Sequence, residues 1–149
     1  MALVNGQIPI LANVINSGVA VLTGTTIGTL GSNTNGVTIY TAGAYGGRIY
    51  SLIASAANAA ITNVFIYILR GATVVPIGLV AVAINAGNIT GTRNNDMLDG
   101  LNLVGMPLDN TGKRYIPLMP NDVLRCSTLV SLAANSCYVT AHGADYQAV

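Results

Sequence analysis

The chain has 149 residues, a length that suits one domain, and 7% of them are acidic or basic, against about 25% in an average soluble protein. Its net charge of +1 and the scattering of its six Lys and Arg residues argue against a nucleic-acid partner. With 52% hydrophobic residues, and with Gly, Ala, Asn, Thr and Ser standing where charged residues are usual, the chain is better suited to packing against other subunits than to staying dispersed as a monomer.

The first seventeen residues carry no charge, are rich in Asn and follow no regular apolar period. We interpret residues 1–17 as an extended N-terminal arm. Residues 18–149 are expected to form a single β-sandwich domain, since no linker or internal repeat divides them. No basic residue precedes the apolar stretch near the N-terminus, so a secretory signal is not expected and cytoplasmic synthesis is the default.

Short apolar runs alternate with turn residues along the rest of the chain, which is typical of an antiparallel β-sandwich. Turn pairs such as Asn35-Gly36 and Arg70-Gly71 separate the runs. Residues 54–60 contain alanines that favour helix, but we interpret them as a loop or a single turn. About nine short strands are predicted, at residues 18–22, 37–41, 48–56, 63–69, 74–82, 101–106, 115–118, 123–128 and 136–142.

The clearest predicted hairpin joins residues 63–69 to residues 74–82, and both strands are apolar on each face. In the first strand, one face carries only Val and Ile, at positions 64, 66 and 68. The other face carries Phe65, Tyr67 and Leu69. A sheet with one face in water should instead alternate apolar and polar residues. The second face is covered either by a loop of the same chain or by a neighbouring subunit, and the low charge favours the subunit.

The segments 123–128 and 136–142 alternate more regularly and are predicted to pair as the final hairpin. Their pattern places Cys126 and Cys137 on inward faces of facing strands. A cross-strand disulfide is geometrically conceivable, but in a cytoplasmic product buried, reduced thiols are favoured.

The sequence offers little catalytic chemistry. His142 is the only histidine, which excludes a His-based metal cluster, and Gly143 is expected to break the strand between it and Asp145. Asp96 and Asp99 lie in a polar loop that lacks calcium-loop spacing, so we interpret them as solvated turn residues. We therefore assign no catalytic, cofactor-binding or metal-binding residue, and we expect neither a cofactor nor enzymatic activity.

Two charge-free stretches, residues 49–69 and 71–92, are long enough to span a bilayer as helices. Polar residues interrupt both of them and break the continuous apolar run that insertion favours. A soluble protein is therefore preferred over a small membrane protein of the lysis type.

A resemblance rests on the second half of the chain. The run from Arg114 to Leu124 (RYIPLMPNDVL) and the later segment AHGADY, residues 141–146, resemble small virion proteins of tailed bacteriophages, in which a Pro-Leu-x-x-Gly-Asp-x-Leu turn precedes two final strands and a Gly-x-Asp-Tyr tail. Asn121 stands where that pattern commonly has Gly, a replacement that a left-handed turn tolerates. Residues 47–82 are similar in layout only. The resemblance implies a head decoration, or cement, protein with a jelly-roll-like β-sandwich.

Three functional hypotheses follow. In the leading one, the chain is a virion protein, assembled in the host cytoplasm, that binds the major capsid protein on the capsid exterior and stabilises the shell through multivalent contact. It is expected to form a homo-oligomer, and the resemblance implies that this oligomer is a trimer. No nucleic-acid or membrane partner is expected. The alternative is a tail, baseplate or fibre component that binds a host surface, and the third is the lysis-type membrane protein.

Overall fold

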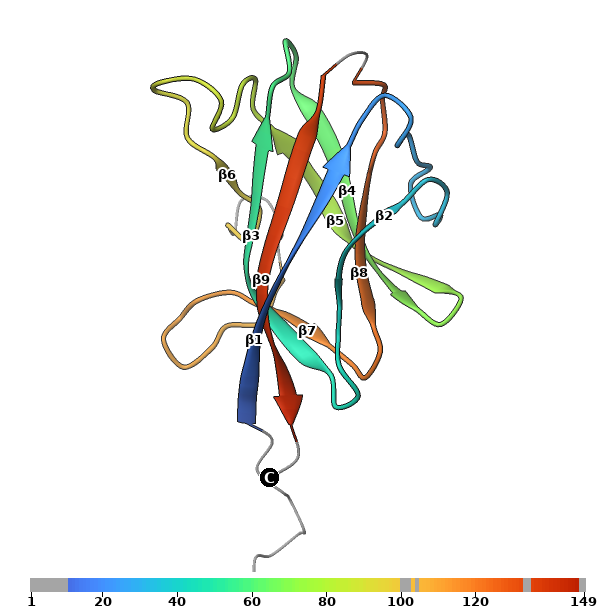
Figure 1. Cartoon of the computed structure of the whole chain (residues 1–149), viewed down its shortest axis with the longest axis vertical. Helices are drawn as coiled ribbons and strands as arrows, with labels where there is room; N and C mark the ends of the chain where they lie inside the picture. Colours follow the sequence, from blue (N-terminus) through green and yellow to red (C-terminus); the bar gives the residue numbers. More distant parts are fainter. Residues whose placement is uncertain (1–10, 100–102, 104, 133–134, 148–149) are drawn as a thin grey trace, which may run out of the picture.

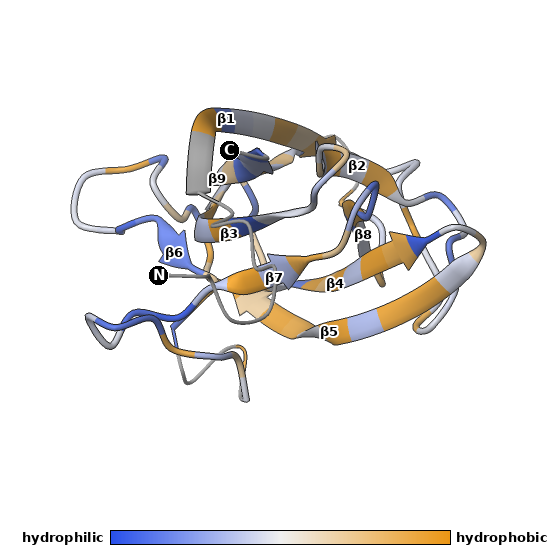
Figure 2. Ribbon diagram, turned by 90° about the horizontal axis from the view of Figure 1, so that it is seen from below, coloured by the Kyte–Doolittle hydropathy of each residue, from blue (hydrophilic) through white to orange (hydrophobic). Residues whose placement is uncertain are grey.

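The computed structural model describes residues 11–99, 103, 105–132 and 135–147. Throughout these residues the regular secondary structure consists of strands, and the strands form two antiparallel sheets that pack face to face (Figures 1 and 2). The prediction of an antiparallel β-sandwich is therefore confirmed. Within the described ranges, no helix is long and apolar enough to span a bilayer.

Each sheet takes strands from distant parts of the chain. Sheet A has the order β1 (Leu11–Leu22), β9 (Cys137–Gln147) and β3 (Gly47–Ala56), and the far edge of β3 pairs with both β6 (Asn95–Asp96) and β7 (Ile116–Leu118). Sheet B has the order β2 (Val37–Thr41), β8 (Val123–Thr128), β4 (Thr62–Arg70) and β5 (Thr73–Val82).

Five of the strand pairings are nested in four levels along the sequence. β4 pairs with β5, β3 pairs with β6 and β7, β2 pairs with β8, and β1 pairs with β9. The chain is thus one long antiparallel ribbon that folds back at Gly71, where φ is +59° and a glycine is favoured. The ribbon is folded so that each of its two arms contributes strands to both sheets.

Most of the predicted strands are confirmed with small shifts at their ends, and the β4–β5 hairpin is confirmed. The N-terminal arm needs correction, because β1 begins at Leu11 and residues 11–17 pair with the second half of β9. Residues 1–10 of the predicted arm lie outside the described residues. The predicted strand at 101–106 lies partly outside them too, and residues 103, 105 and 106 are not in a strand. The edge of β3 is instead taken by the short, polar β6.

Gly143 was expected to end its strand, but β9 runs through it to Gln147. A Cβ on Gly143 would lie 2.8 Å from the carbonyl oxygen of Arg48 and 2.7 Å from Cδ1 of Ile49. The glycine therefore allows β9 and β3 to approach closely, and the strand depends on it.

The core between the sheets contains both cysteines. Cys126 and Cys137 are buried and unbridged, as predicted. Their predicted pairing in a final hairpin is wrong, because β8 belongs to sheet B and β9 to sheet A, so the chain crosses the sandwich between them. Burial raises the pKa of the Cys137 thiol to about 11 and also raises that of Cys126, so both thiols are protonated at neutral pH.

The outer face of β4 is covered by the chain itself. Phe65 and Tyr67 stack with ring centroids 5.0 Å apart and are fully buried. The loop from residue 23 to residue 36 lies along β8 beside them, with the backbone N–H of Gly28 donating to the carbonyl of Thr128 at 2.7 Å. The Tyr67 hydroxyl donates to Asn33 Oδ1 at 2.9 Å. The preference for a neighbouring subunit at this face is therefore wrong for both aromatic residues.

Replacing Tyr67 with Phe tests how this loop is held. The variant keeps the stacked ring and removes the hydroxyl that Asn33 accepts from, so we expect a loss of about 1 kcal/mol in the free energy of unfolding. Amide exchange measured by mass spectrometry should become faster in residues 27–36 and stay unchanged in β1. Equal exchange rates in the loop of both proteins would contradict the assigned role.

The two long sides of the sandwich are closed in different ways. On one side β1 crosses close to β2, and a Cβ on Gly18 would lie 1.7 Å from the carbonyl oxygen of Ile39. On the other side the long connection after β5 supplies Met97, Leu98 and Leu103 to the core, and Leu103 packs against Gly78. The second side therefore carries the irregular segments that shape the surface near β3 and β6.

Candidate functional site

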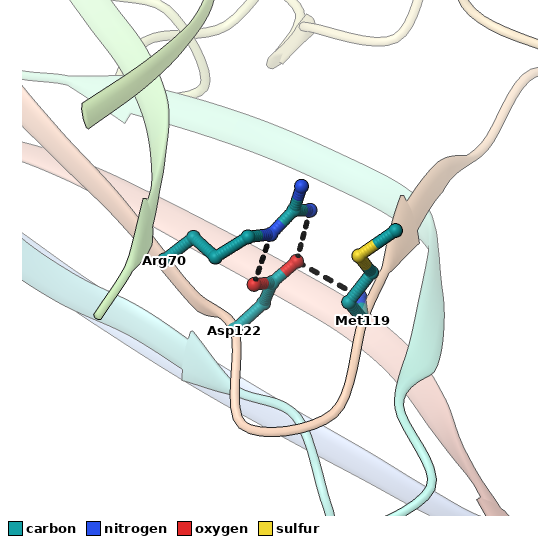
Figure 3. Close-up of polar contacts among 3 residues, drawn as sticks. All are labelled: Arg70, Met119 and Asp122. Carbon is teal, nitrogen blue, oxygen red and sulfur yellow. Dashed lines mark hydrogen bonds and ion pairs between the residues drawn. The ribbon is translucent and has the colours of Figure 1, made fainter. Parts of the chain in front are cut away.

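Several of the few charged residues in this chain stabilise the fold. Arg70 donates from Nε to Asp122 Oδ1 at 2.9 Å and from Nη2 to Oδ2 at 2.7 Å, and Oδ2 also accepts from the backbone N–H of Met119 at 2.8 Å (Figure 3). Asn121, next to this carboxylate, has φ of +60°, the left-handed conformation expected at its position. The Asn-Asp turn therefore clamps the β7–β8 connection to the end of β4 and is not available for chemistry.

Two other charged side chains are used in the same way. Asp145 accepts from the Tyr40 hydroxyl at 3.0 Å and from the backbone N–H of Gly43 at 3.1 Å, which joins β9 to the end of β2. Burial, together with the hydrogen bond to Asp145, raises the pKa of Tyr40 well above its usual range. Arg125 donates to Asn33 Oδ1 and to the carbonyl of Gly36, which holds the loop over β8.

Most of the remaining charged residues gather around a cleft beside β3. Four of the chain's six basic and five acidic residues contribute to it, two of each sign. Its volume is about 640 Å³, within the range of small-ligand sites. The lining residues are Tyr50, Ser51, Ile53, Asn94, Asp96, Leu98, Asp99, Gly112, Lys113 and Arg114.

One wall of the cleft comes from β3. The pairing of β3 with β9 shifts register between Ile49 and Ser51, so Tyr50 is the extra residue of a β-bulge. Ile49 and Leu52 both lie in the core, and the two residues between them therefore turn outward. The Tyr50 side chain is 44% exposed at the cleft.

A tight turn supplies the basic wall. Leu108 and Arg114 form an antiparallel bridge, and Asp109 Oδ1 accepts from the backbone N–H groups of Thr111 and Lys113 at 2.8 and 2.9 Å. These hydrogen bonds, first that from Lys113, lower the pKa of Asp109. The turn fixes the backbone from which the Lys113 and Arg114 side chains extend.

The acidic wall is tied to both sheets. Asp96 pairs with Ile53 of β3 and accepts from the backbone N–H of Leu98 at 3.0 Å. Its neighbour Asn95 donates to the carbonyl of Ala81 at 3.2 Å, which reaches β5 in sheet B. Asp96, interpreted as a solvated turn residue, therefore lies on the anchored strand β6, whereas Asp99 lies exposed in a bend after it, as expected. Both aspartates line the cleft together with Lys113, which the sequence did not indicate.

A second surface feature is the outward face of β1 and β9, which we name the β1–β9 face. It carries Ile15, Ser17, Val19 and Val21 from β1 and Tyr138, Thr140 and His142 from β9. The apolar members are exposed, and none of the seven residues is acidic, Lys or Arg. His142 lies here between Ser17 and Ser51, on a different face of β9 from Asp145, so the two do not form a catalytic pair.

The described residues contain no group of three or more His, Cys, Asp or Glu side chains placed to hold a metal ion. The described surface features are a neutral apolar face and, beside it, a cleft with both signs of charge. Comparison of the chain with protein-family models, curated proteins and solved structures found no match.

Proposed function

We propose that the chain is a capsid decoration protein of a tailed bacteriophage. In this proposal it binds the major capsid protein on the outside of the head and stabilises the shell, with no chemical reaction. It acts as a homo-oligomer, a trimer by the resemblance, and its sandwich is assigned to the jelly-roll type, an assignment that the nested pairing of its strands supports. Jelly rolls are common in capsid subunits, but a fold alone does not assign a function, so the proposal has to rest on the surface.

The observation that supports this proposal most is the exposed apolar surface of the β1–β9 face. On the outer face of sheet B, Phe65 and Tyr67 are buried beside the loop at residues 23–36, whereas on sheet A Val19 is 57% exposed and its apolar neighbours on β1 and β9 are open to solvent. Each square ångström of apolar surface removed from water contributes about 25 cal/mol to association. A face without acidic or basic side chains, apart from a single histidine, can also be repeated around a shell without repulsion between copies. It suits a broad, reaction-free contact with a regular protein surface.

A substitution on this face tests the proposal. Val19→Lys places a charge in the contact, so binding to capsids that lack the protein should fall by at least about tenfold in a co-sedimentation assay. Ile89→Lys is the matched control, because Ile89 is 53% exposed in the loop after β5 and lies outside the β1–β9 face. Equal binding by both variants would refute the assigned face. A wild-type chain that remains monomeric at micromolar concentration in analytical ultracentrifugation would refute the oligomer.

The alternative function, a tail, baseplate or fibre component that binds a host surface, is favoured by the cleft beside β3. A tail component would use the same neutral face against other tail subunits and leave the cleft free for a ligand. Electron microscopy of virions labelled with an antibody against the chain separates the two functions. Label around the head supports the decoration protein, and label confined to the tail supports the alternative.

A further inference from the structure

We propose that the cleft beside β3 binds an uncharged saccharide. The site is distinct from the proposed capsid contact, because Val19 lies on β1 at one edge of sheet A and the cleft lies where β3 meets β6 at the other. Ser51 and Ile53 form its base, and the acidic and basic walls rise on the side away from β9.

The balance of charge restricts the ligand. Asp96 and Asp99 would repel a polyanion, and Lys113 and Arg114 would repel a polycation, so neither class matches the whole cleft. A hydroxyl group, by contrast, both donates and accepts hydrogen bonds. A ligand with several hydroxyl groups can therefore donate to the carboxylates and accept from the ammonium and guanidinium groups at the same time.

The apolar part of the cleft suits a sugar ring. Tyr50 projects from the bulge as an exposed aromatic ring, and Ile53 and Leu98 add aliphatic surface next to it. A pyranose presents C–H groups on its ring faces and hydroxyl groups around its rim, so it can pack on the tyrosine while its rim reaches the charged walls. A small polar ligand without an apolar face would leave this part of the cleft unused.

The cleft is also held in shape before any ligand arrives. The Asp109 turn fixes the basic wall, and the bonds of Asp96 and Asn95 fix the acidic wall to both sheets. On the third side, Ser55 donates to Asn94 Oδ1 at 3.0 Å. A rigid site loses less conformational entropy on binding.

The test uses the purified full chain without capsids, so its outcome does not depend on the decoration function. Saturation-transfer NMR is run with three neutral oligosaccharides, namely maltotriose, lactose and triacetylchitotriose, and the binding constant is obtained by titration. We expect at least one of them to bind and inorganic phosphate at the same concentration not to displace it. No transfer to any of the three, or displacement by phosphate, would overturn the proposal.

Variants then locate the site. Tyr50→Ala should weaken binding by about tenfold or more, and Asp96→Asn, which keeps an oxygen for the Leu98 N–H, should weaken it by about threefold. Tyr45→Ala is the matched control, because Tyr45 is another exposed tyrosine and lines a smaller hollow next to Asp145. Urea titration checks that each variant is folded. Binding that survives Tyr50→Ala, or that is lost with Tyr45→Ala instead, would place the saccharide elsewhere and overturn the assignment.

Discussion

Replacing Asp122 with Ala is expected to lower the free energy of unfolding by about 3 kcal/mol, a large part of the stability of a domain of this size. The carboxylate is 1% exposed and accepts two hydrogen bonds from Arg70 and one from the backbone N–H of Met119. The alanine variant leaves that N–H without an acceptor and unties the β7–β8 turn from β4. Urea titration followed by tyrosine fluorescence measures the loss.

Substitutions of arginine provide the control for this prediction. Arg70→Met leaves the buried carboxylate without its counter-charge and should lower the urea midpoint, but by less than Asp122→Ala, because Arg70 is 43% exposed. Arg93→Met removes an exposed arginine in a loop and should change stability by less than about 0.5 kcal/mol. Similar urea midpoints for Asp122→Ala and Arg93→Met would show that the clamp does not support the fold.

The same pair gives the stability of the protein a defined acid dependence. The hydrogen bond from Arg70, and after it the bond from Met119 and the positive charge of Arg70, lower the pKa of Asp122 against the opposing effect of burial. The stabilisation is therefore fully present above the unfolded-state pKa of about 3.9 and is lost as the pH falls through the lower folded-state pKa. Urea midpoints measured from pH 6 to pH 2 should fall less steeply for Asp122→Asn than for the wild type.

Replacing Gly18 with Ala is expected to cost about 3 kcal/mol or to prevent folding. The new Cβ would lie 1.7 Å from the carbonyl oxygen and 2.9 Å from the carbonyl carbon of Ile39, so β1 and β2 would have to move apart. Without this contact, Gly→Ala in a strand would stabilise the protein, because alanine restricts the unfolded chain.

Ser17→Ala, one residue earlier and exposed, is the control and should leave the urea midpoint almost unchanged. Both variants are compared by urea titration and by amide exchange of β2, which should rise only in Gly18→Ala. A Gly18→Ala protein as stable as the wild type would mean that the two strands do not meet as described.

Strands that are bounded by local turn signals could be predicted from the sequence. Residues 37–41 and 123–128 match β2 and β8 because Asn35-Gly36 and Asn121-Asp122 set their beginnings. β1 was predicted too short because its first residues alternate weakly and are ordered by β9, whose residues come more than a hundred positions later. Pairing between segments so far apart in the sequence produces no recognisable local pattern in either segment.

The cleft could not be predicted for a related reason. Its walls come from β3, from the β6 segment and from the turn at residues 108–114, and no fixed spacing links the three. Asn95 and Asp96 are polar residues that would not be expected in a strand, and they pair only because the edge of β3 is open to them. The role of Gly18 could not be predicted for the same reason, because no residue near it in the sequence indicates that the backbone of Ile39 lies against it.

The pairing of β1 with β9 also determines how the protein resists mechanical force. Leu11 lies opposite Gln147 at one end of the ladder, and Leu22 lies opposite Cys137 at the other. Tension that draws Leu11 away from Gln147 loads a single pair of hydrogen bonds at a time, so the two strands separate like a zipper at low force. Tension between Leu11 and Cys137 shears all the pairs together and is resisted far better. If the proposed decoration function holds, a shell under internal pressure would be reinforced only where the tension acts on this domain along the strands.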